Sequence, residues 1–346
     1  MKVAVVFGGI SFEHEISIVS SIAMKDVLKN ELIYIFIDKN RELYEIPSSK
    51  INSKLFSSGE YSKFDRVYFK KDGFYKITGL FKKEQNIDFD VVLNLSHGGD
   101  GEDGILASMF DFYNISFVGP RTEACVVSSN KFITKGYAQS VEVKTLPYKY
   151  FTKNDKIEIN EFPAIIKPVK LGSSIGVAIV KTKEELSYAL DVAFEFDDAI
   201  IVEPFISGVK EYNLAGTKIA GEFVFSIIEE PQKADFLDFD KKYLDFSRTS
   251  KAQEVDLGEK LNKEIKNSFK NLYNTLFEGS LIRCDFFVVD NEVYLNEINS
   301  IPGSMANYLF EDFQTTFEKI VKNLPKKKFI PINYDYVNKI QVAKGK

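Results

Sequence analysis

Four polar residues near the C-terminal end of the chain combine types and spacing that suit a metal ion. Arg283 and Asp285 alternate along one predicted strand, "LIRCDFFVV", and Glu297 and Asn299 alternate along the next, "EVYLNEIN". Alternate residues share one face of a strand, so each pair lies together. Asp, Glu and Asn oxygens without His or Cys are hard ligands that suit Mg²⁺, which usually shares its coordination with phosphates. The sequence therefore predicts a magnesium site next to a phosphate group.

The strand that carries Glu297 and Asn299 begins as a half-buried one. Val293 and Leu295 alternate with polar residues, and the same alternation places Glu297 and Asn299 on the face of the apolar pair. A Pro-Gly turn follows directly in "NSIPGS". We therefore expect one strand face to change from hydrocarbon to ligands along its length.

The length of the hairpin loop decides whether these residues meet. A two-residue loop, Asp290-Asn291, would pair Asp285 with Asn296 and turn Glu297 to the opposite face, which would break the site. A three-residue loop, 290–292, pairs Asp285 directly with Glu297. Two facing carboxylates repel each other unless a cation lies between them. We predict the three-residue loop; the alternative is a surface hairpin with both carboxylates in water.

A glycine-rich loop offers donors for the phosphates. In "AIIKPVKLGSSIGVAIV", Lys167 ends a predicted strand, and residues 172–176 form a loop rich in backbone N–H and hydroxyl groups. Such a loop can cradle an anion, and the Lys adds a point charge. The pattern is not a Walker A loop, because G-x-x-x-x-G-K-[ST] occurs nowhere in the chain. A flexible hairpin turn is the alternative interpretation.

A second glycine motif, "GDGEDG" at residues 99–104, matches G-x-G-x-x-G and follows a predicted strand. Asp100, Glu102 and Asp103 would place three negative charges against a pyrophosphate. That repulsion argues against a dinucleotide site and against a dehydrogenase. The loop is better suited to orienting a cationic group or a helix N-terminus.

The elements that position these motifs alternate between strands and helices over the first 120 residues. This alternation predicts a parallel sheet with helices on both faces. A predicted hairpin with an Asp-Gly turn interrupts it at residues 66–77. The predicted strands are residues 2–8, 32–38 and 91–96, and the predicted helices are residues 15–30 and 105–114.

Two further α/β units follow. Inside the second of these, before its last hairpin, a charged stretch at residues 231–254 lacks clear periodicity and predicts a functional lid or disorder. The second unit has predicted helices at 128–140 and 183–196 and predicted strands at 162–170, 177–182 and 199–205. The third has predicted strands at 211–219, 222–230 and 282–299 and predicted helices at 259–277 and 311–324.

Bulk properties argue against several classes of protein. The chain has 346 residues and a net charge of −5, which suits two or three domains and lacks the basic excess of a nucleic-acid-binding protein. No apolar run approaches the roughly 18 residues that cross a bilayer, and the N-terminus predicts a first strand rather than a signal peptide. Cys125 and Cys284 are far apart and predict free thiols in a reducing cytoplasm. With only His14 and His97, a His-rich metal site is excluded.

Lys167 before a glycine loop, Glu203 at the end of "IIVEPF", and R-x-D followed by E-x-N together resemble the ATP-grasp fold. More narrowly, the chain resembles the D-alanine–D-alanine ligase family along nearly its whole length, through "FGGISFEHEISIVSS", "HGGDGEDG", "KPVKLGSSIGV", "VEPFISGVKEY", "KKYLD", "RCDF" and "NEINSIPG". The resemblance implies three α/β domains with ATP held between the last two. These are an N-terminal Rossmann-like substrate domain with a parallel sheet (1–121), a central ATP-grasp lid domain (122–206) and a C-terminal catalytic domain (207–346).

The resemblance implies an enzyme that joins two D-alanines to D-alanyl-D-alanine for peptidoglycan synthesis. One substrate carboxylate attacks ATP to give an acyl phosphate, which the amine of the second substrate then attacks. The implied cofactors are ATP and two Mg²⁺ ions, with Mn²⁺ as a substitute. A cytoplasmic homodimer without nucleic-acid or membrane partners is the implied working form. The alternative is a ligase with D-serine or D-lactate as the acceptor.

The resemblance also implies which residues bind the nucleotide and the metal. Asp285, Glu297 and Asn299 are the implied metal ligands. The residues implied for ATP are Lys131 and Lys167 at the phosphates, Ser174 in the loop over them, Lys242 at the γ-phosphate, Glu203 with Pro204, Phe205 and Ile206 at the adenine, and Glu211 at the ribose.

A further group of residues is implied for the amino-acid substrates and for catalysis. Two departures from the family pattern lie here: His14 replaces the usual Arg, and "GSMANYLF" places Tyr308 where a Ser would hold the acceptor's carboxylate. Tyr243 is the family's residue for D-alanine, whereas Phe there is associated with D-lactate, so D-alanine is the expected acceptor. The implied residues are Glu15 at the ammonium of the first D-alanine with His97 close by, Ser173 and Tyr243 hydrogen-bonded with Glu15, Arg283 at the developing oxyanion, and Gly303, Tyr308 and Leu309 at the second substrate.

Overall fold

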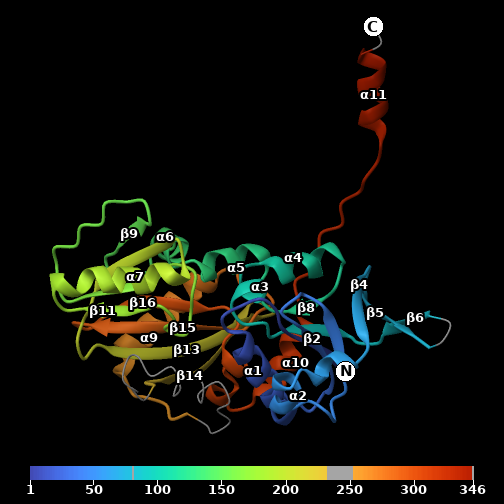
Figure 1. The fold of residues 1–346 in the computed structure, drawn as a ribbon, viewed down its shortest axis with the longest axis horizontal. Helices are drawn as coiled ribbons and strands as arrows, with labels where there is room; N and C mark the ends of the chain where they lie inside the picture. Colours follow the sequence, from blue (N-terminus) through green and yellow to red (C-terminus); the bar gives the residue numbers. More distant parts are fainter. Residues whose placement is uncertain (80–81, 232–251, 345–346) are drawn as a thin grey trace.

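Three β-sheets follow one another along the chain (Figure 1). This computed structural model describes residues 1–79, 82–231 and 252–344. The first sheet has eight strands, and the other two have four each. Each sheet packs against helices, so the predicted α/β class is confirmed.

The first sheet is mixed, with three parallel and four antiparallel strand pairs. Its strands are β1 Lys2–Gly8, β2 Glu31–Ile37, β3 Leu43–Ile46, β4 Arg66–Lys70, β5 Gly73–Thr78, β6 Lys83–Ile87, β7 Val91–Asn94 and β8 Phe117–Val118, in the order β6-β5-β4-β3-β2-β1-β7-β8. Pairing is parallel from β2 through β1 and β7 to β8, and antiparallel from β2 to β6. The predicted parallel sheet is therefore present, and four further strands extend it on one side by antiparallel pairing. Residues 38–42, between β2 and β3, are too few for the crossover that a parallel pair needs.

Helices cover both faces of the first sheet, as predicted. Helices α1 (His14–Val27), α2 (Ser53–Ser57) and α10 (Phe313–Lys322) pack on one face, and α4 (Ile105–Phe112) and α5 (Thr122–Ser129) pack on the other. Alternate residues of β1 contact the two groups, because successive side chains of a strand point to opposite faces. The carboxyl ends of the parallel strands thus open toward one end of this unit.

The second and third sheets are antiparallel and carry the two later motifs. The second has the order β11-β10-β12-β9 and packs against α7, and the third has the order β14-β13-β15-β16 and packs against α9. The second contains β9 Lys149–Thr152, β10 Ala164–Pro168, β11 Ala178–Val180, β12 Ala199–Pro204 and α7 Leu186–Phe196. The third contains β13 Lys210–Ile219, β14 Glu222–Glu229, β15 Ile282–Val289, β16 Glu292–Asn299 and α9 Gly258–Tyr273.

The hairpin of β4 and β5 turns one residue earlier than predicted. Lys70 pairs with Gly73, so the loop is Lys71-Asp72 rather than Asp-Gly. Asp72 has a φ of 66°, a left-handed conformation that Asp adopts more readily than most residues.

The hairpin of β15 and β16 has the two-residue loop Asp290-Asn291, so the predicted three-residue loop is wrong. Both loop residues have positive φ, 51° and 60°, as a type I′ turn requires. A β-bulge at Asn296 inserts one extra residue into β16 and restores the predicted pairing of Asp285 with Glu297. The bulge therefore preserves the site that a regular two-residue hairpin would break.

The bulge also reverses the face on which the polar residues lie. Val293 and Leu295 pack in the hydrophobic core, and Ile298 joins them there. Glu297 and Asn299 line a cavity on the opposite face, contrary to the prediction from strict alternation. One extra residue shifts the alternation of a strand by one position, which exchanges its two faces.

The helix predicted at residues 128–140 is two helices. Helix α5 ends at Ser129, and α6 (Lys131–Ser140) begins after Asn130. The Asn130 side chain accepts hydrogen bonds from the backbone N–H groups of Phe132 and Ile133 at 3.0 and 3.1 Å. This N-cap satisfies two of the donors that the first turn of a helix leaves unpaired.

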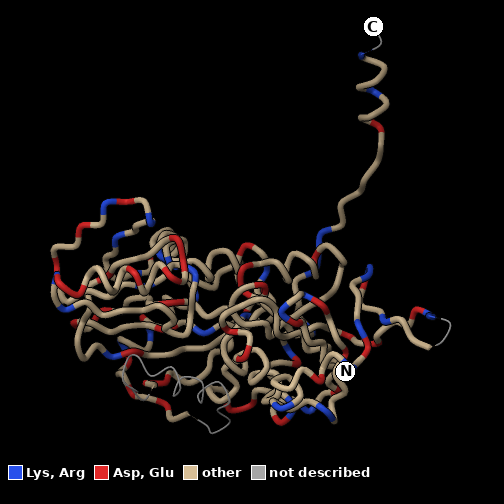
Figure 2. Tube along the Cα trace, viewed as in Figure 1, with Lys and Arg blue, Asp and Glu red and all other residues tan. Residues whose placement is uncertain are grey.

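The C-terminal segment continues beyond the last predicted helix. Helix α10 corresponds to the helix predicted at 311–324, but a further helix, α11 (Asp335–Lys344), follows and projects from the body (Figure 1). Basic and acidic residues are interspersed along the described chain, including this segment (Figure 2). Among the described helices, none is long and apolar enough to span a membrane.

Candidate active site

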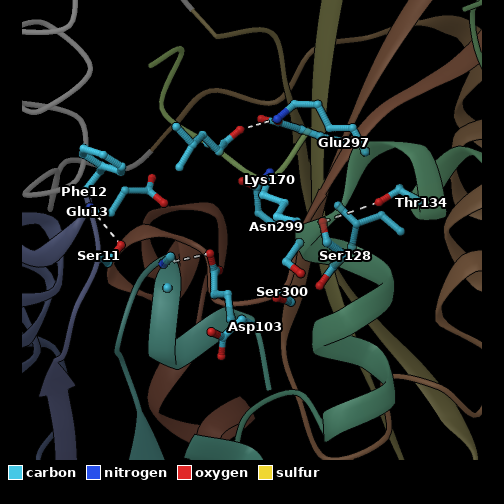
Figure 3. A pocket seen from close by; sticks show the side chains of 18 of the residues that line it. Ser11, Phe12, Glu13, Asp103, Ser128, Thr134, Lys170, Glu297, Asn299 and Ser300 are labelled. Carbon is cyan, nitrogen blue, oxygen red and sulfur yellow. Dashed lines mark hydrogen bonds between the residues drawn. The ribbon is translucent and has the colours of Figure 1, made fainter. Parts of the chain in front are cut away.

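A cavity of about 480 Å³ is lined by residues from all three units. The loop after β1, helix α3 (Gly99–Glu102), helices α5 and α6, the loop after β10 and the end of β16 all contribute. Figure 3 shows Glu13 on one side of the cavity and Glu297 and Asn299 on the other. The lining residues are 10–13, 98–99, 102–103, 128–129, 131, 134, 170–172 and 296–300.

The carboxylate that lines the cavity near the start of α1 is Glu13 and not the predicted Glu15. Glu13 is 8% exposed and accepts a hydrogen bond from the hydroxyl group of Ser173, a bond predicted for Glu15. Glu15 is exposed to solvent and does not line the cavity. Side chains turn by about 100° per residue in a helix, so two Glu residues two positions apart at the start of α1 point in different directions. Glu13 is therefore the candidate partner for a substrate ammonium group.

Burial raises the pKa of Glu13. The hydrogen bond from Ser173 and the charge of Lys131 oppose this effect, and the charge of Glu297 adds to it. A cationic group that enters the cavity would stabilise the ionised form of Glu13.

Arg283 and Asp285 form a fixed ion pair on the cavity side of β15. The Nε and Nη2 atoms of Arg283 donate to the two carboxylate oxygens of Asp285 at 2.7 and 2.8 Å. The side-chain amide of Asn299 also donates to Asp285, at 3.0 Å. Burial raises the pKa of Asp285, Arg283 lowers it, and the facing Glu297 raises it again. The four residues that the sequence singled out are thus brought together.

The donor set of this cluster fits a hard divalent cation. Asp285 and Glu297 face each other across the two strands, and Asn299 adds an amide. In the part of the chain that the structure describes, no group of three or more His, Cys, Asp and Glu side chains is arranged so that it could hold a metal ion by itself. A metal ion here would therefore depend on Asn299 and on phosphate oxygens for its remaining ligands.

Lys131 and the glycine loop border the cavity from the second unit. The Lys131 ammonium group donates to the carbonyl oxygen of Leu171, and burial lowers its pKa. Ser173 and Ser174 both have left-handed φ, 52° and 59°, at the tip of the loop. Lys170, which the sequence did not single out, also lines the cavity.

Glu203 contacts two lysines. Its carboxylate forms ion pairs with Lys167 at 2.6 Å and with Lys135, and Lys167 also donates to Asn296 at 3.2 Å. Burial would raise the pKa of Glu203, but the two lysines hold it below its usual value. The predicted residues Lys167 and Glu203 therefore act as neighbours in one charged network.

The residues predicted to bind adenine and ribose, Glu203 included, do not line this cavity. Pro204 is exposed, and Phe205, Ile206 and Glu211 are half-buried. The backbone N–H of Phe205 donates to the carbonyl oxygen of Pro163 at 3.0 Å. Their roles at a nucleotide remain predictions.

The residues predicted for the second substrate lie in and around a short 3₁₀ segment, η3 (Gly303–Leu309). Tyr308 is buried beside Arg283, and burial raises the pKa of its hydroxyl group. Leu309 belongs to the hydrophobic core. Gly303 is buried at the start of the segment.

His97 is buried and connects this segment with α1. Its Nε2 atom lies 2.9 Å from the hydroxyl oxygen of Ser20, which also accepts the backbone N–H of Ser304 at 3.2 Å. Burial lowers the pKa of His97 to about 4, so the ring is neutral at pH 7. A neutral His97 positions neighbouring groups and does not supply a charge.

Glu102 is a half-buried carboxylate in the cavity wall, and the sequence assigned it no hydrogen bonds to the backbone. It accepts the backbone N–H groups of Gly98 at 3.0 Å and of Ile301 at 3.1 Å. Burial and the charge of Glu13 raise its pKa to about 8. The same motif also orients a cation, because Asp100 pairs with Arg41 at 2.8 Å.

Four residues of the site were not assigned to it from the sequence, and the sequence patterns that could have indicated them differ. Glu13 stands at the predicted start of a helix, where one residue of difference changes the direction of a side chain. Lys135 follows Lys131 by four residues and so shares its helix face. Glu102 belongs to an acidic motif whose partners are not encoded nearby. Asn296 left no signal, because its position depends on the bulge.

Lys242 and Tyr243 lie outside the described residues. The predicted lid at 231–254 does so as well, apart from residue 231 and residues 252–254. Their predicted roles at the γ-phosphate and beside the first substrate therefore stay predictions.

Models of protein families match most of the chain. The model described as "D-ala D-ala ligase N-terminus" matches residues 2–120, and the model described as "D-ala D-ala ligase C-terminus" matches residues 138–325. The D-alanine–D-alanine ligase of Wolinella succinogenes is 58% identical over 347 aligned positions, which cover 100% of both chains.

Solved structures agree with this similarity. The crystal structure of D-alanine–D-alanine ligase from Helicobacter pylori matches with a TM-score of 0.84 and 47% identity, over 95% of this chain and 100% of that one. The VanG D-Ala:D-Ser ligase from Enterococcus faecalis matches with a TM-score of 0.73 and 27% identity, over 93% and 97% of the two chains.

Proposed function

Because the chain belongs to the D-alanine–D-alanine ligase family, we propose that the cavity between its three units is where two D-alanines are joined. The predicted family and the ATP-grasp fold are confirmed. The chain is an ATP-dependent ligase that forms D-alanyl-D-alanine, a precursor of peptidoglycan. The proposal concerns which residues carry out each step.

One observation supports this function best: a buried carboxylate lies across the cavity from oxygen ligands that suit a metal ion. Glu13 lines one side, and Glu297 and Asn299 line the other (Figure 3); Lys131 also lines the cavity. An amino acid has an ammonium group and a carboxylate, so it can bind with the first at Glu13 and the second toward the phosphates. Glu13 therefore takes the role predicted for Glu15.

In the first step, a carboxylate oxygen of the first D-alanine attacks the γ-phosphorus of ATP. The bond from this phosphorus to the bridging oxygen breaks, and ADP leaves with the electron pair. Glu13 holds the ammonium group, which keeps the carboxylate directed at ATP. Lys131 and Lys167 neutralise phosphate charge, the main task of a protein in phosphoryl transfer.

In the second step, the neutral amine of the second D-alanine attacks the carbonyl carbon of the acyl phosphate. The C–N bond forms, inorganic phosphate leaves, and the nitrogen loses a proton. Arg283 stabilises the oxyanion that develops, and Asp285 fixes the orientation of its guanidinium group. In other enzymes one such donor lowers the barrier by about 3–4 kcal/mol.

Mg²⁺ belongs to the proposal because the donor set fits it. Asp285, Glu297 and Asn299 would hold two Mg²⁺ ions, or Mn²⁺ in their place, together with phosphate oxygens. Bound there, the ions supply positive charge that stabilises the transferred phosphoryl group.

D-alanine is the acceptor that the relatives favour. The D-alanine–D-alanine ligase of W. succinogenes is 58% identical, whereas the D-Ala:D-Ser ligase VanG is 27% identical. The rival acceptors D-serine and D-lactate are therefore not favoured. Tyr308 beside Arg283 supports binding of the acceptor near the oxyanion.

The proposal also covers the domains, the assembly and the location of the enzyme. The three sheets support domain limits near residues 1–121, 122–206 and 207–346. We propose a homodimer formed through the N-terminal domain, which the family resemblance supports. A cytoplasmic location is supported by Cys125 and Cys284, which are free thiols.

The purified protein, incubated with ATP, Mg²⁺ and D-alanine, tests this function. Phosphate release and the mass of the product are followed, with D-serine, D-lactate and L-alanine added in parallel reactions beside D-alanine. We expect D-alanyl-D-alanine as the main product and no reaction in EDTA. A mixed product with D-serine or D-lactate at a comparable rate would overturn the assignment of the acceptor, and activity in EDTA would overturn the metal site.

A further inference from the structure

A chain of polar contacts connects helix α6 with the end of β16. Lys135 pairs with Glu203, Glu203 pairs with Lys167 at 2.6 Å, and Lys167 donates to Asn296 at 3.2 Å. Lys135 and Glu203 are each only 3% exposed. The contacts therefore form one network inside the protein that ends at the wall of the cavity.

The strand register explains why Lys167 and Glu203 meet. In the pairing of β10 with β12, Lys167 lies opposite Ile201, and Glu203 is two residues further along the strand. Diagonal neighbours of this kind share a face of the sheet and lie within reach of long side chains. Lys135 approaches the same carboxylate from α6, and its ammonium group lies 5.3 Å from the centre of the Tyr148 ring.

Lys131 and Lys135 are one helical turn apart but have different surroundings. Lys131 lines the cavity, whereas Lys135 lies behind it and does not line the cavity. The contact of Lys135 is with Glu203, which also holds Lys167, so we expect the charge of Lys135 to act through Glu203.

The network has two cations for one anion. Lys135 and Lys167 share the single carboxylate of Glu203, and Asn296 is neutral. This leaves one positive charge in excess, which a phosphate group can neutralise. Without Lys135, Glu203 and Lys167 would form a closed, neutral pair.

The second lysine becomes important when Lys167 leaves Glu203 to bind a phosphate. If Lys167 were the only partner of Glu203, its departure would leave a buried carboxylate without a counter-ion. Removing one partner of a buried ion pair is strongly unfavourable, because the remaining charge is neither solvated nor paired. With Lys135 in place, Glu203 keeps a partner throughout.

We propose that Lys135 is a positioning residue for ATP: as a second counter-ion of Glu203, it allows Lys167 to leave that carboxylate and bind the nucleotide phosphates. This inference rests on the proposed role of Lys167 at ATP. It adds a residue that acts on phosphate affinity without contacting the ligand.

The substitution K135M tests the proposal, because Met keeps most of the buried hydrocarbon and removes the charge. Calorimetry with Mg²⁺ measures the affinities for ATP and for adenosine, which lacks phosphates. We expect the ratio of ATP affinity to adenosine affinity to fall at least about tenfold in K135M, since breaking buried pairs typically has large effects. The KM for ATP should rise by a similar factor, with little change in the KM for D-alanine.

The double variant K135M/E203Q provides the decisive comparison. The neutral amide that E203Q introduces would no longer hold Lys167 by charge, so the affinity ratio should return toward the wild-type value. A purely structural role of Lys135 would weaken ATP and adenosine equally, and E203Q would not restore the ratio. Either an unchanged ratio in K135M or an equal loss for both ligands overturns the proposal.

The matched control is K144M. Lys144 also forms an ion pair, with Glu292 at 2.8 Å, but it is exposed and lies outside the cavity. The affinity ratio should be unchanged in K144M. If K135M does not fold, K135Q carries the same test, because its amide can still donate one hydrogen bond to Glu203.

The variant K167M separates failure of this inference from failure of the proposed role of Lys167. K167M should lose ATP affinity but keep adenosine affinity. If K167M keeps both, the role of Lys167 is wrong. If K167M behaves as expected and K135M does not change the ratio, only the inference about Lys135 is wrong.

Discussion

At the scale of single residues, buried charges around the cavity are paired with neighbouring side chains. Ser173 donates a hydrogen bond to Glu13, and Arg283 donates two to Asp285. Lys135 and Lys167 form ion pairs with Glu203. An unpaired charge in such a place costs several kcal/mol, so substitutions here affect folding as well as binding. Useful tests therefore compare a buried residue with a matched exposed one.

The substitutions E13Q and E15Q form such a pair. Glu13 is buried in the cavity wall and Glu15 is exposed, so only E13Q removes the charge that we propose to meet the substrate ammonium. We expect kcat/KM for D-alanine to fall roughly 100-fold in E13Q, the equivalent of about 3 kcal/mol for a broken buried pair. E15Q should stay within about twofold of the wild type, as surface charges usually do.

Steady-state phosphate release at varied D-alanine concentration measures this difference, with the KM for ATP as an internal check. A large loss in E15Q and none in E13Q would restore the original assignment of Glu15.

At the scale of elements, the β15–β16 hairpin brings its ligands together through two irregular features. The tight turn at Asp290-Asn291 brings the strands together, and the bulge at Asn296 sets which residues of β16 face Asp285. Neither feature alone would place Glu297 opposite Asp285. The metal-type cluster therefore depends on a turn and a bulge that act together.

Residue 291 tests the turn. Asn291 has a φ of 60°, which Gly adopts without strain and a β-branched residue adopts only at a cost. We expect N291G to stabilise the protein by about 0.5 kcal/mol and N291V to destabilise it by more than about 1 kcal/mol. Urea denaturation measures both free energies of unfolding.

Ligase activity in the folded state should be unchanged in N291G, because the turn lies far along the strand from Glu297. Equal stability of N291G and N291V would mean that residue 291 is not in a left-handed turn.

At the scale of the whole molecule, the cavity exists because contacts cross between the three units. Glu102 of α3 accepts the backbone N–H of Ile301, and Ser20 of α1 accepts that of Ser304. The Ser173–Glu13 bond joins the second unit to the first. Each of these contacts joins segments that are far apart in the sequence, so the site forms only when the units assemble.

Glu102 makes the free energy of unfolding depend on pH. Its pKa is about 8 in the folded protein, against about 4.3 for an unfolded Glu. The folded state therefore binds the proton more tightly, and the stability that Glu102 contributes below about pH 4 is lost as the pH rises through about 8. E102Q removes this titration.

We expect the melting temperature of the ligand-free wild type to fall more steeply between about pH 5 and about pH 8.5 than that of E102Q. Thermal unfolding followed by circular dichroism at several pH values measures both slopes. D103N serves as the control on the neighbouring, partly exposed carboxylate. Parallel curves for the wild type and E102Q would contradict the raised pKa.

The C-terminal segment makes a different prediction. Beyond Lys327, which pairs with Asp111 at 3.2 Å, the described residues are exposed, including Phe329 at 86% and Tyr336 at 74%. Removal of residues 330–346 should therefore change the melting temperature by less than about 2 °C and leave kcat unchanged, because little buried surface is lost.

Thermal unfolding, the ligase assay and analytical ultracentrifugation check the truncated protein. A loss of activity together with a change in oligomeric state would show that this segment contacts a second copy of the chain.

The sequence by itself determined the residue types of the site and their order along the chain. "RCDF", "NEIN" and the glycine loop after Lys167 contain the proposed metal ligands, oxyanion donor and phosphate donors, and strand periodicity located the elements that carry them. These features are local, since alternation, turn residues and motif spacing act over a few neighbouring residues. The α/β class and the family followed from them.

Only the tertiary structure decided which of these side chains meet. The bulge at Asn296 placed Glu297 opposite Asp285 although the hairpin loop has two residues, and the start of α1 placed Glu13 rather than Glu15 in the cavity wall. The packing of α6 against the end of the third sheet brought Lys135 to Glu203. Each of these outcomes depends on contacts between residues that are distant in sequence. A shift of one residue in a strand or a helix exchanges buried and exposed faces, and it is the packed core that selects between the two.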